Sequence, residues 1–211
     1  MRKKIIERPP SPRQRMINLM YIVLLAMLAM NISSDVLNGF TLVEESLSRS
    51  TSNATIQNEA VYKEFAASDS INHEKVGEWY NKALSVKSMS DSLYNFAGEL
   101  KELIAKEADG KKAEINNLQN KEDLEAATQV MLSPTKGRGQ DLYNAINSYR
   151  DRILEMIDNP VQRDIISNNF STDVPDKSGA LNKNWQEYNF ENMPAVAAIT
   201  LLTKLQNDIR Y

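Results

Sequence analysis

The chain has 211 residues, no cysteine, a single histidine and a formal net charge of −3 at pH 7. The lack of cysteine excludes disulfide scaffolds and cysteine nucleophiles, and one histidine alone makes zinc sites and histidine-based catalytic triads implausible. Beyond the basic N-terminal residues, the sequence shows no stripe of Lys and Arg of the kind that binds nucleic acid. We therefore expect that the chain is not an enzyme, that it binds no cofactor or metal, and that it has no nucleic-acid partner.

The first predicted segment is an arm over residues 1–12, where three prolines disfavour regular structure. Ser11 followed by Pro12 is typical of a helix N-cap and the first position of a helix. We expect a helix to begin there and to continue through Arg13 and Arg15.

An uncharged, largely apolar run from Met16 to Ser34 comes next. A helix over this run would be about 28 Å long, close to the thickness of the hydrocarbon core of a bilayer. Basic residues dominate before the run, and acidic residues follow it until Arg49. The positive-inside rule then places the N-terminus in the cytoplasm and the rest outside, which is the periplasm in a Gram-negative cell. We predict a single transmembrane helix over residues 13–36, in the inner membrane.

A cleaved signal peptide is the alternative interpretation of this run. Its basic start fits a signal peptide, but the run exceeds the usual apolar length of about 7–15 residues. The residues from Asn31 to Ser34 also match a small-x-small cleavage site poorly. An uncleaved signal anchor fits better.

Beyond the span, apolar residues keep a helical spacing and strand patterns are nearly absent. The first helix is expected to run on past the membrane face through Leu47, and residues 51–58 are only weakly patterned. Residues 37–211 are predicted to form an all-α periplasmic bundle of four to five helices. The many Asp and Glu residues are expected on exposed helix faces.

Three further helices are predicted over residues 72–108, from Leu142 to Ile157 and over residues 193–210. Ile165 and Ile166 are assigned to a short turn or helix. An aromatic cluster of Trp185, Tyr188 and Phe190 is expected to close one end of the bundle. The last helix reaches Tyr211 without a C-cap, so we expect the natural protein to continue with further domains.

The predicted span contains polar and small residues that a passive anchor does not need. The candidates are Asn18, Tyr21, Ala26, Ala29, Asn31, Ser33 and Asp35. Ala26, Ala29 and Ser33 lie along one side, where small side chains permit close contact with another helix. Generic anchor composition is the alternative. Asp35, at the periplasmic edge, is a candidate proton-entry or register residue, and solvation on the helix surface is its alternative role.

Arg13 is the candidate for an ion pair with a partner. It lies one turn before Ile17, at the cytoplasmic edge of the predicted span. A cation inside a membrane assembly is costly unless it is paired, so a partner's carboxylate would stabilise Arg13 there. Snorkelling of the side chain to the headgroups is the alternative, and we expect it for Arg15.

The stretch from Ser11 to Tyr21, Ser-Pro-Arg-Gln-Arg-Met-Ile-Asn-Leu-Met-Tyr, resembles the N-terminal signature of the GldM/PorM family. Residues 25–31 and 35–40 extend the resemblance across the span and into the helix that leaves it. The resemblance implies an inner-membrane subunit of a motor that uses the proton motive force to power type 9 secretion and gliding motility. It also implies a homodimer whose membrane helices sit inside a pentameric ring of a GldL/PorL-like partner.

In that family, the arginine of the Pro-Arg-Gln motif pairs with a membrane glutamate of the ring, and the matching residue here is Arg13. Family members also carry β-rich periplasmic domains that reach outer-membrane components, and this chain lacks them. The core of the span contains no Asp or Glu, so the proton-carrying acid is expected in the partner. The alternative function is a membrane-anchored periplasmic sensor, which would need a second span that these residues do not contain.

Overall fold

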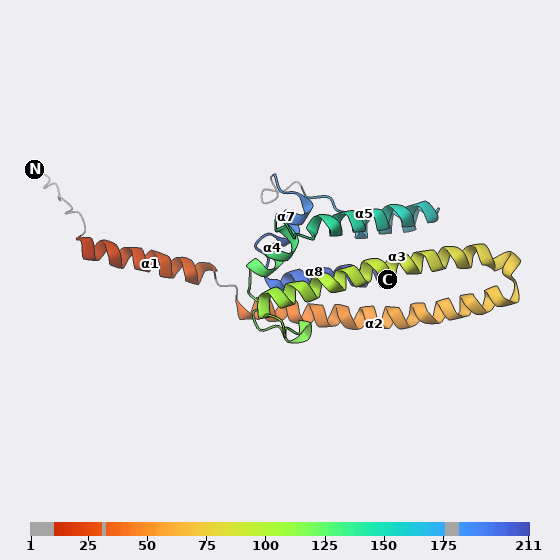
Figure 1. Ribbon diagram of the computed structural model, residues 1–211, viewed down its shortest axis with the longest axis horizontal. Coiled ribbons are helices and arrows are strands. Elements are labelled where there is room, and N and C mark those ends of the chain that lie inside the picture. The colour runs from red at the N-terminus through yellow and green to blue at the C-terminus, as the bar shows by residue number, and fades with distance from the viewer. Residues whose placement is uncertain (1–10, 31–32, 176–181) are drawn as a thin grey trace, which may run out of the picture. The chain divides into compact units, whose positions relative to one another are not determined.

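The computed structural model describes residues 11–30, 33–175 and 182–211, with the backbone alone for residues 27–30 (Figure 1). These residues form eight α-helices and one short 3₁₀ helix, and the described part of the chain contains no strand. The predicted all-α class is therefore confirmed. The chain divides into two compact units, residues 1–34 and residues 35–211, which are described separately.

The first unit contains helix α1 (Pro12–Met30). Its start agrees with the sequence prediction, because Ser11 Oγ accepts a hydrogen bond of 3.3 Å from the backbone N–H of Gln14. Among the described residues, no helix combines the length and the hydropathy needed to cross a membrane. The transmembrane assignment therefore stays a prediction.

Helix α1 does not run on into the next helix as the sequence predicted. It ends at Met30, and helix α2 (Ser34–Ile71) begins only at Ser34. Ser33 lies outside both helices, and serine side chains compete for backbone hydrogen bonds and so disfavour the interior of a helix. Asn31 lies outside the described residues.

The second unit begins with a hairpin of two long antiparallel helices, α2 and α3 (His73–Asp109), joined at Asn72 (Figure 1). The side chain of Asn72 caps α3 by accepting a hydrogen bond of 3.2 Å from Lys75 N–H. Helix α2 continues through the weakly patterned residues 51–58. There, the hydroxyl groups of Thr51 and Thr55 donate to backbone carbonyl oxygens one turn earlier, at 2.8 and 2.9 Å. Both hydroxyl groups thus find a hydrogen-bond acceptor within the helix itself.

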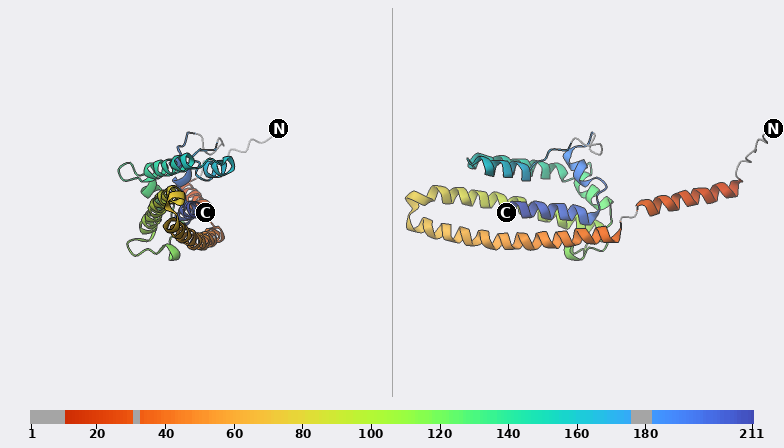
Figure 2. Two further views of the ribbon diagram at one scale, coloured as in Figure 1. Left: turned by 90° about the vertical axis from the view of Figure 1, so that its right-hand side faces the viewer. Right: turned by 180° about the vertical axis from the view of Figure 1, so that it is seen from behind.

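Helix α8 (Ala195–Arg210) packs against α3 and lies beside α2 (Figures 1 and 2). Small residues make this contact close, because Ala97 on α3 and Ala195 and Ala198 on α8 are fully buried. Larger apolar side chains fill the space around them, namely Leu100, Ile104, Ile199 and Leu202. The last predicted helix is thus confirmed as a core element, with buried apolar area as its main source of stability.

Four shorter helices and one 3₁₀ turn complete the second unit. They are η1 (Ile115–Asn117), α4 (Glu125–Leu132), α5 (Gly139–Met156), α6 (Pro160–Asn169) and α7 (Trp185–Phe190). Helix α5 packs on α3, and α6 packs on α5. Helices α2 to α8 make seven α-helices in the described part of residues 35–211, so the predicted number of four to five is too small.

The two helices that the sequence analysis missed are short. Helix α4 has 8 residues and α7 has 6, so neither shows enough turns for a clear apolar period. They are held by packing: Ala127 and Phe190 are almost completely buried. The aromatic cluster is confirmed in part, because the rings of Trp185 and Phe190 meet edge to face at 6.0 Å while Tyr188 is 39% exposed.

Candidate functional site

Four of the predicted site residues lie along α1. Arg13, Asn18, Tyr21 and Ala26 are all exposed, at separate positions on this single helix. Asn18 Oδ1 accepts a hydrogen bond of 3.1 Å from the side chain of Gln14 one turn earlier. Arg13 lies in the first turn of α1, and its exposed guanidinium group is accessible to a partner.

The other predicted residues lie near the end of α1 or beyond it. Ala29 belongs to α1, but its side chain is outside the described residues, as is Asn31. Ser33 precedes α2, and Asp35 lies in the first turn of α2, where a negative charge stabilises the helix dipole. Both are exposed.

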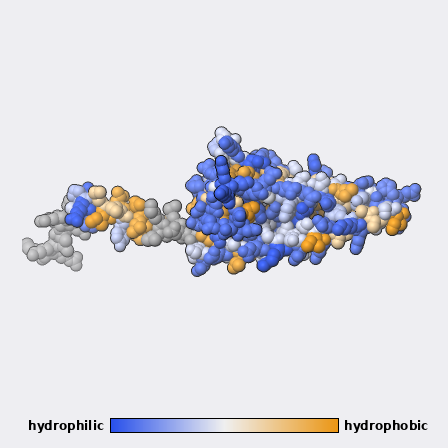
Figure 3. All heavy atoms as spheres, turned by 60° about the horizontal axis from the view of Figure 1, so that its bottom comes forward, coloured by the Kyte–Doolittle hydropathy of each residue, from blue (hydrophilic) through white to orange (hydrophobic). Residues whose placement is uncertain are grey.

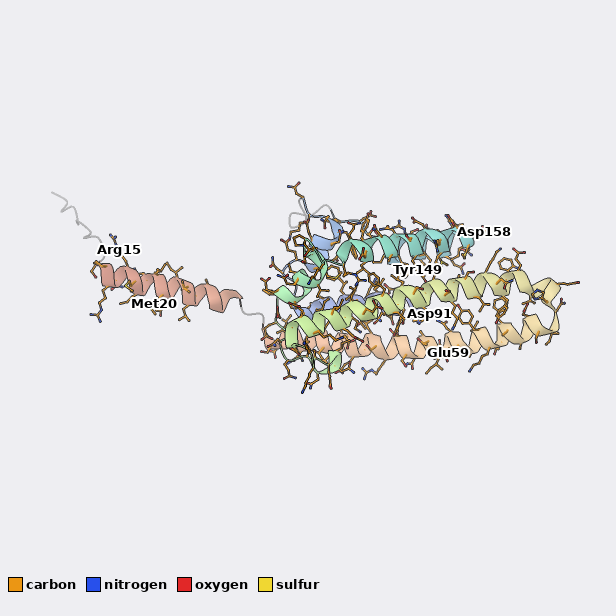
Figure 4. The ribbon with its side chains drawn as sticks, in the orientation of Figure 1. Arg15, Met20, Glu59, Asp91, Tyr149 and Asp158 are labelled. Carbon is orange, nitrogen blue, oxygen red and sulfur yellow. The ribbon has the colours of Figure 1, made fainter. Side chains whose placement is uncertain are left out.

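Between Arg15 and residue 26, the surface of α1 is apolar on nearly all sides. Every apolar side chain from Met16 to Leu25 is exposed, with Met20 at 69%. Apolar patches on this helix are visible in Figure 3, and Figure 4 shows Met20 pointing away from the helix. A continuous apolar surface of this kind marks a site that contacts a membrane or another protein.

The second candidate site is a buried polar cluster around Glu44 of α2. Its oxygen Oε1 receives Ser48 Oγ at 3.0 Å, Lys101 Nζ at 3.2 Å and Thr203 Oγ1 at 3.0 Å. Lys101 belongs to α3 and Thr203 to α8, so one carboxylate oxygen joins three helices. Glu44 is 6% exposed and Lys101 is 7% exposed.

Lys101 has a second partner in this cluster. Its ammonium group donates to Gln206 Oε1 at 3.3 Å, and Gln206 Nε2 in turn donates to the backbone oxygen of Tyr94 at 3.0 Å. Burial nevertheless lowers the pKa of Lys101, and Glu44 offsets only part of that effect. The cluster thus holds a largely buried charge pair, in which Glu44 Oε1 and Lys101 Nζ also bond to uncharged neighbours.

Polar contacts between α2 and α8 continue on both sides of this cluster. Thr200 Oγ1 lies 3.3 Å from the backbone oxygen of Phe40, and Thr51 Oγ1 lies 3.3 Å from Asn207 Oδ1. Asn58 Nδ2 donates to the backbone oxygen of Arg210 at 2.7 Å. We call this row the polar seam; on α2 it consists of Phe40, Glu44, Thr51 and Asn58, and on α8 of Thr200, Thr203, Asn207 and Arg210.

A cleft of about 520 Å³ lies next to the last turn of α8. Figure 4 places its lining residues Glu59 on α2, Asp91 on α3 and Tyr149 on α5. Arg210 pairs with Asp91 at 2.7 Å, and the hydroxyl groups of Ser90 and Tyr149 are 3.0 Å apart. Burial raises the pKa of Tyr149. These internal pairings involve Ser90, Asp91, Tyr149 and Arg210, while Arg210 Nε is buried without a hydrogen-bond partner among the described residues.

The sequence analysis did not identify the polar seam. It placed acidic residues on exposed faces, which is wrong for Glu44, because that side chain occupies a core position of α2. The available signal was the spacing of Leu37, Glu44, Thr51 and Asn58 at intervals of seven, a heptad pattern in which polar residues occupy apolar positions. Across the described residues, no group of three or more His, Cys, Asp or Glu side chains could hold a metal ion.

Comparison with known proteins adds one finding. Residues 35–211 match the family described as the GldM N-terminal domain. The curated proteins contain no match to the chain. The matched region coincides with the second structural unit and covers most of the sequence. The chain therefore belongs to the GldM family, which is associated with gliding motility and type 9 secretion.

Proposed function

We propose that the chain is the inner-membrane subunit of a motor that uses the proton motive force to drive type 9 secretion and gliding. In this proposal α1 lies in the membrane with its N-terminus in the cytoplasm, and residues 35–211 lie in the periplasm. The observation that carries it is the surface of α1, where arginines at the start are followed by exposed apolar side chains without any acid. That distribution favours insertion with the basic end inside.

The proposed partner is a ring of a multi-span GldL/PorL-like protein around two copies of α1. Helix α1 contains no Asp or Glu that could carry protons or pair with Arg13. A cation at this depth is stabilised by a carboxylate from a neighbouring helix. The polar side chains of Asn18 and Tyr21 would likewise find partners among surrounding helices more readily than in lipid. Arg13 is therefore assigned to an ion pair with a membrane glutamate of the ring.

The role proposed for the second unit is to carry the motion of α1 into the periplasm. Helix α2 begins at Ser34, the last residue of the first unit, and extends for 38 residues. The polar seam and the Lys101–Glu44 pair connect α2 to α8 and α3. A homodimer of this chain would then act as an axle, with no chemical step performed by its own residues.

Co-purification from membranes tests this proposal. The full chain, carrying an affinity tag, is expected to bring down a multi-span membrane protein that contains a glutamate within a span. The mass of the intact complex should correspond to two copies of this chain and five of the partner. A chain that is cleaved behind Ser34, or that purifies alone from mild detergent, would contradict the proposal.

A further inference from the structure

The buried face of α2 differs in kind from those of its neighbours. Only Leu37, Glu44 and Thr51 of this 38-residue helix are buried, and two of these three are polar. Helix α8, by contrast, buries ten of its 16 residues, most of them apolar. Two of the three most buried positions of α2 therefore make specific polar contacts, while its apolar residues Phe40, Leu47 and Phe65 are only partly buried.

Polar contacts of this kind specify position. Apolar surfaces tolerate a shift of one helical turn, because one apolar side chain can pack in place of another. A buried polar group, by contrast, needs a specific hydrogen-bond partner. A one-turn displacement of α2 would carry the carboxylate of Glu44 away from Lys101 and Thr203. Both charges would then be buried without compensation, which is strongly unfavourable. A polar residue at a core position of a helical seam fixes register in the same way.

The geometry at Glu44 constrains rotation as well as sliding. The carboxylate is held from α3 by Lys101 and from α8 by Thr203, at 3.2 and 3.0 Å. Since these donors belong to different helices, rolling α2 about its axis would break at least one of the two contacts. Further along the helix, Thr51 contacts Asn207 and Asn58 contacts Arg210, each through one uncharged hydrogen bond, whereas only Glu44 pairs with a charge from a third helix.

We propose that Glu44 and Lys101 are positioning residues that lock α2 into one rotational and axial register against α3 and α8. Their part in the protein is to specify this register, and stability comes mainly from the apolar core. As a consequence that rests on the proposed function, a turn applied at the start of α2 moves residues 35–211 as one body.

Cysteine crosslinking tests the lock, because the chain has no native cysteine. The pair Thr51→Cys with Asn207→Cys reports the observed register, since these side chains are in contact. The pair Thr55→Cys with Asn207→Cys reports a register displaced by one turn of α2. Both pairs are placed in the full chain in membranes and treated with a short thiol-specific crosslinker.

The variant that removes the lock is Glu44→Met with Lys101→Met, which replaces the ion pair by apolar side chains of similar size. Its matched control is Glu102→Met with Lys106→Met, which changes the same residue types in an exposed pair on α3. In the parent and the control, only the observed-register pair should crosslink rapidly. In the Glu44/Lys101 variant this selectivity should be lost, and both pairs should crosslink at comparable rates.

A melting measurement on the same variants separates the lock from plain stabilisation. The Glu44/Lys101 variant is expected to melt at or above the parent temperature, because apolar replacement of a buried ion pair is commonly neutral or stabilising. Selectivity that persists in this variant would overturn the proposal. Should the variant fail to accumulate, Thr203→Val removes one donor without changing the side-chain volume, and it must also weaken the selectivity.

Crosslinking and secretion together distinguish this proposal from the proposed function. Loss of selectivity accompanied by loss of secretion supports the lock and its consequence for motion. Loss of selectivity with normal secretion upholds the lock and overturns that consequence. If the motor assignment itself is wrong, the crosslinking result stands unchanged, since it reads the register of α2 without reference to secretion.

Discussion

Lys101 and Glu44 form an ion pair of 3.2 Å whose two side chains are each less than one tenth exposed. Replacing Lys101 alone by Met is expected to destabilise the protein by about 3–5 kcal/mol, since a buried carboxylate would remain without its cation. Chemical denaturation of the full chain measures the change. An effect within the range of an exposed pair, about 0–1 kcal/mol, would show that water reaches Glu44.

The membrane proposal predicts different roles for two neighbouring arginines. Arg13→Ala should leave folding and insertion intact but reduce secretion and gliding to background, because the partner's carboxylate loses its cation. Arg15→Ala, on the same exposed stretch of α1, is the matched control and should retain both activities. Secretion assays, gliding assays and membrane fractionation measure the outcome. Full activity of the Arg13 variant would falsify the assigned ion pair.

Asp208 on α8 predicts a pH dependence of stability. Burial raises its pKa above the ordinary value of 3.8, and Lys204 only partly opposes this shift. The folded state therefore holds the proton more tightly than the unfolded state. The resulting stabilisation is fully present below pH 3.8 and is lost as the pH rises through the folded-state pKa.

The measurement is the difference in unfolding free energy between the parent and Asp208→Asn, taken at pH values from 3.8 to above the folded-state pKa of Asp208. The asparagine does not titrate, so the parent should gain stability relative to the variant as the pH falls toward 3.8. A difference that stays constant, or that changes in the opposite direction, would show that Asp208 is solvated in the folded state.

Two glycines should respond to alanine in opposite directions. A Cβ atom at Gly137 would lie 2.6 Å from Ser133 O and 2.8 Å from Met131 O, and backbone atoms cannot yield easily. Gly137→Ala is expected to cost about 1–3 kcal/mol. Gly39, inside α2, has nothing within 4 Å of its Cβ position. Gly39→Ala should stabilise the protein by about 0.5–1 kcal/mol. Thermal melting of the two variants checks both signs.

Helices α1, α3, α5 and α8 were predictable because their signals are local and repeated, whereas α2, the longest helix, was predicted only in part because residues 51–58 are weakly patterned. Ser11 and Pro12 mark the start of α1, and many turns of apolar spacing define α3 and α8. Helices α4 and α7 escaped prediction because their few residues are helical through tertiary packing.

Of the two candidate sites, only the one on α1 was indicated by the sequence. The sequence marks Arg13 as a candidate, because a basic residue before an uncharged run indicates membrane topology, and its ion pair with a partner stays a prediction. The polar seam was not indicated, since Glu44, Thr51 and Asn58 have the composition of a solvated face. Their burial depends on Lys101 and on residues of α8, more than 50 positions away along the chain. The heptad spacing marks these positions as candidates for burial, but it does not say which distant residues would pair with them.

The contrast between the two flanks of α8 has a consequence under mechanical load. Its alanine-rich flank adheres to α3 through area that water can enter only by opening a gap along the whole contact. Its other flank holds α2 through discrete polar contacts, which are lost one at a time as the helices begin to separate. Excess torque would therefore peel α2 away one bond at a time while the α3–α8 core stays folded, and the same bonds would re-form when the strain ends.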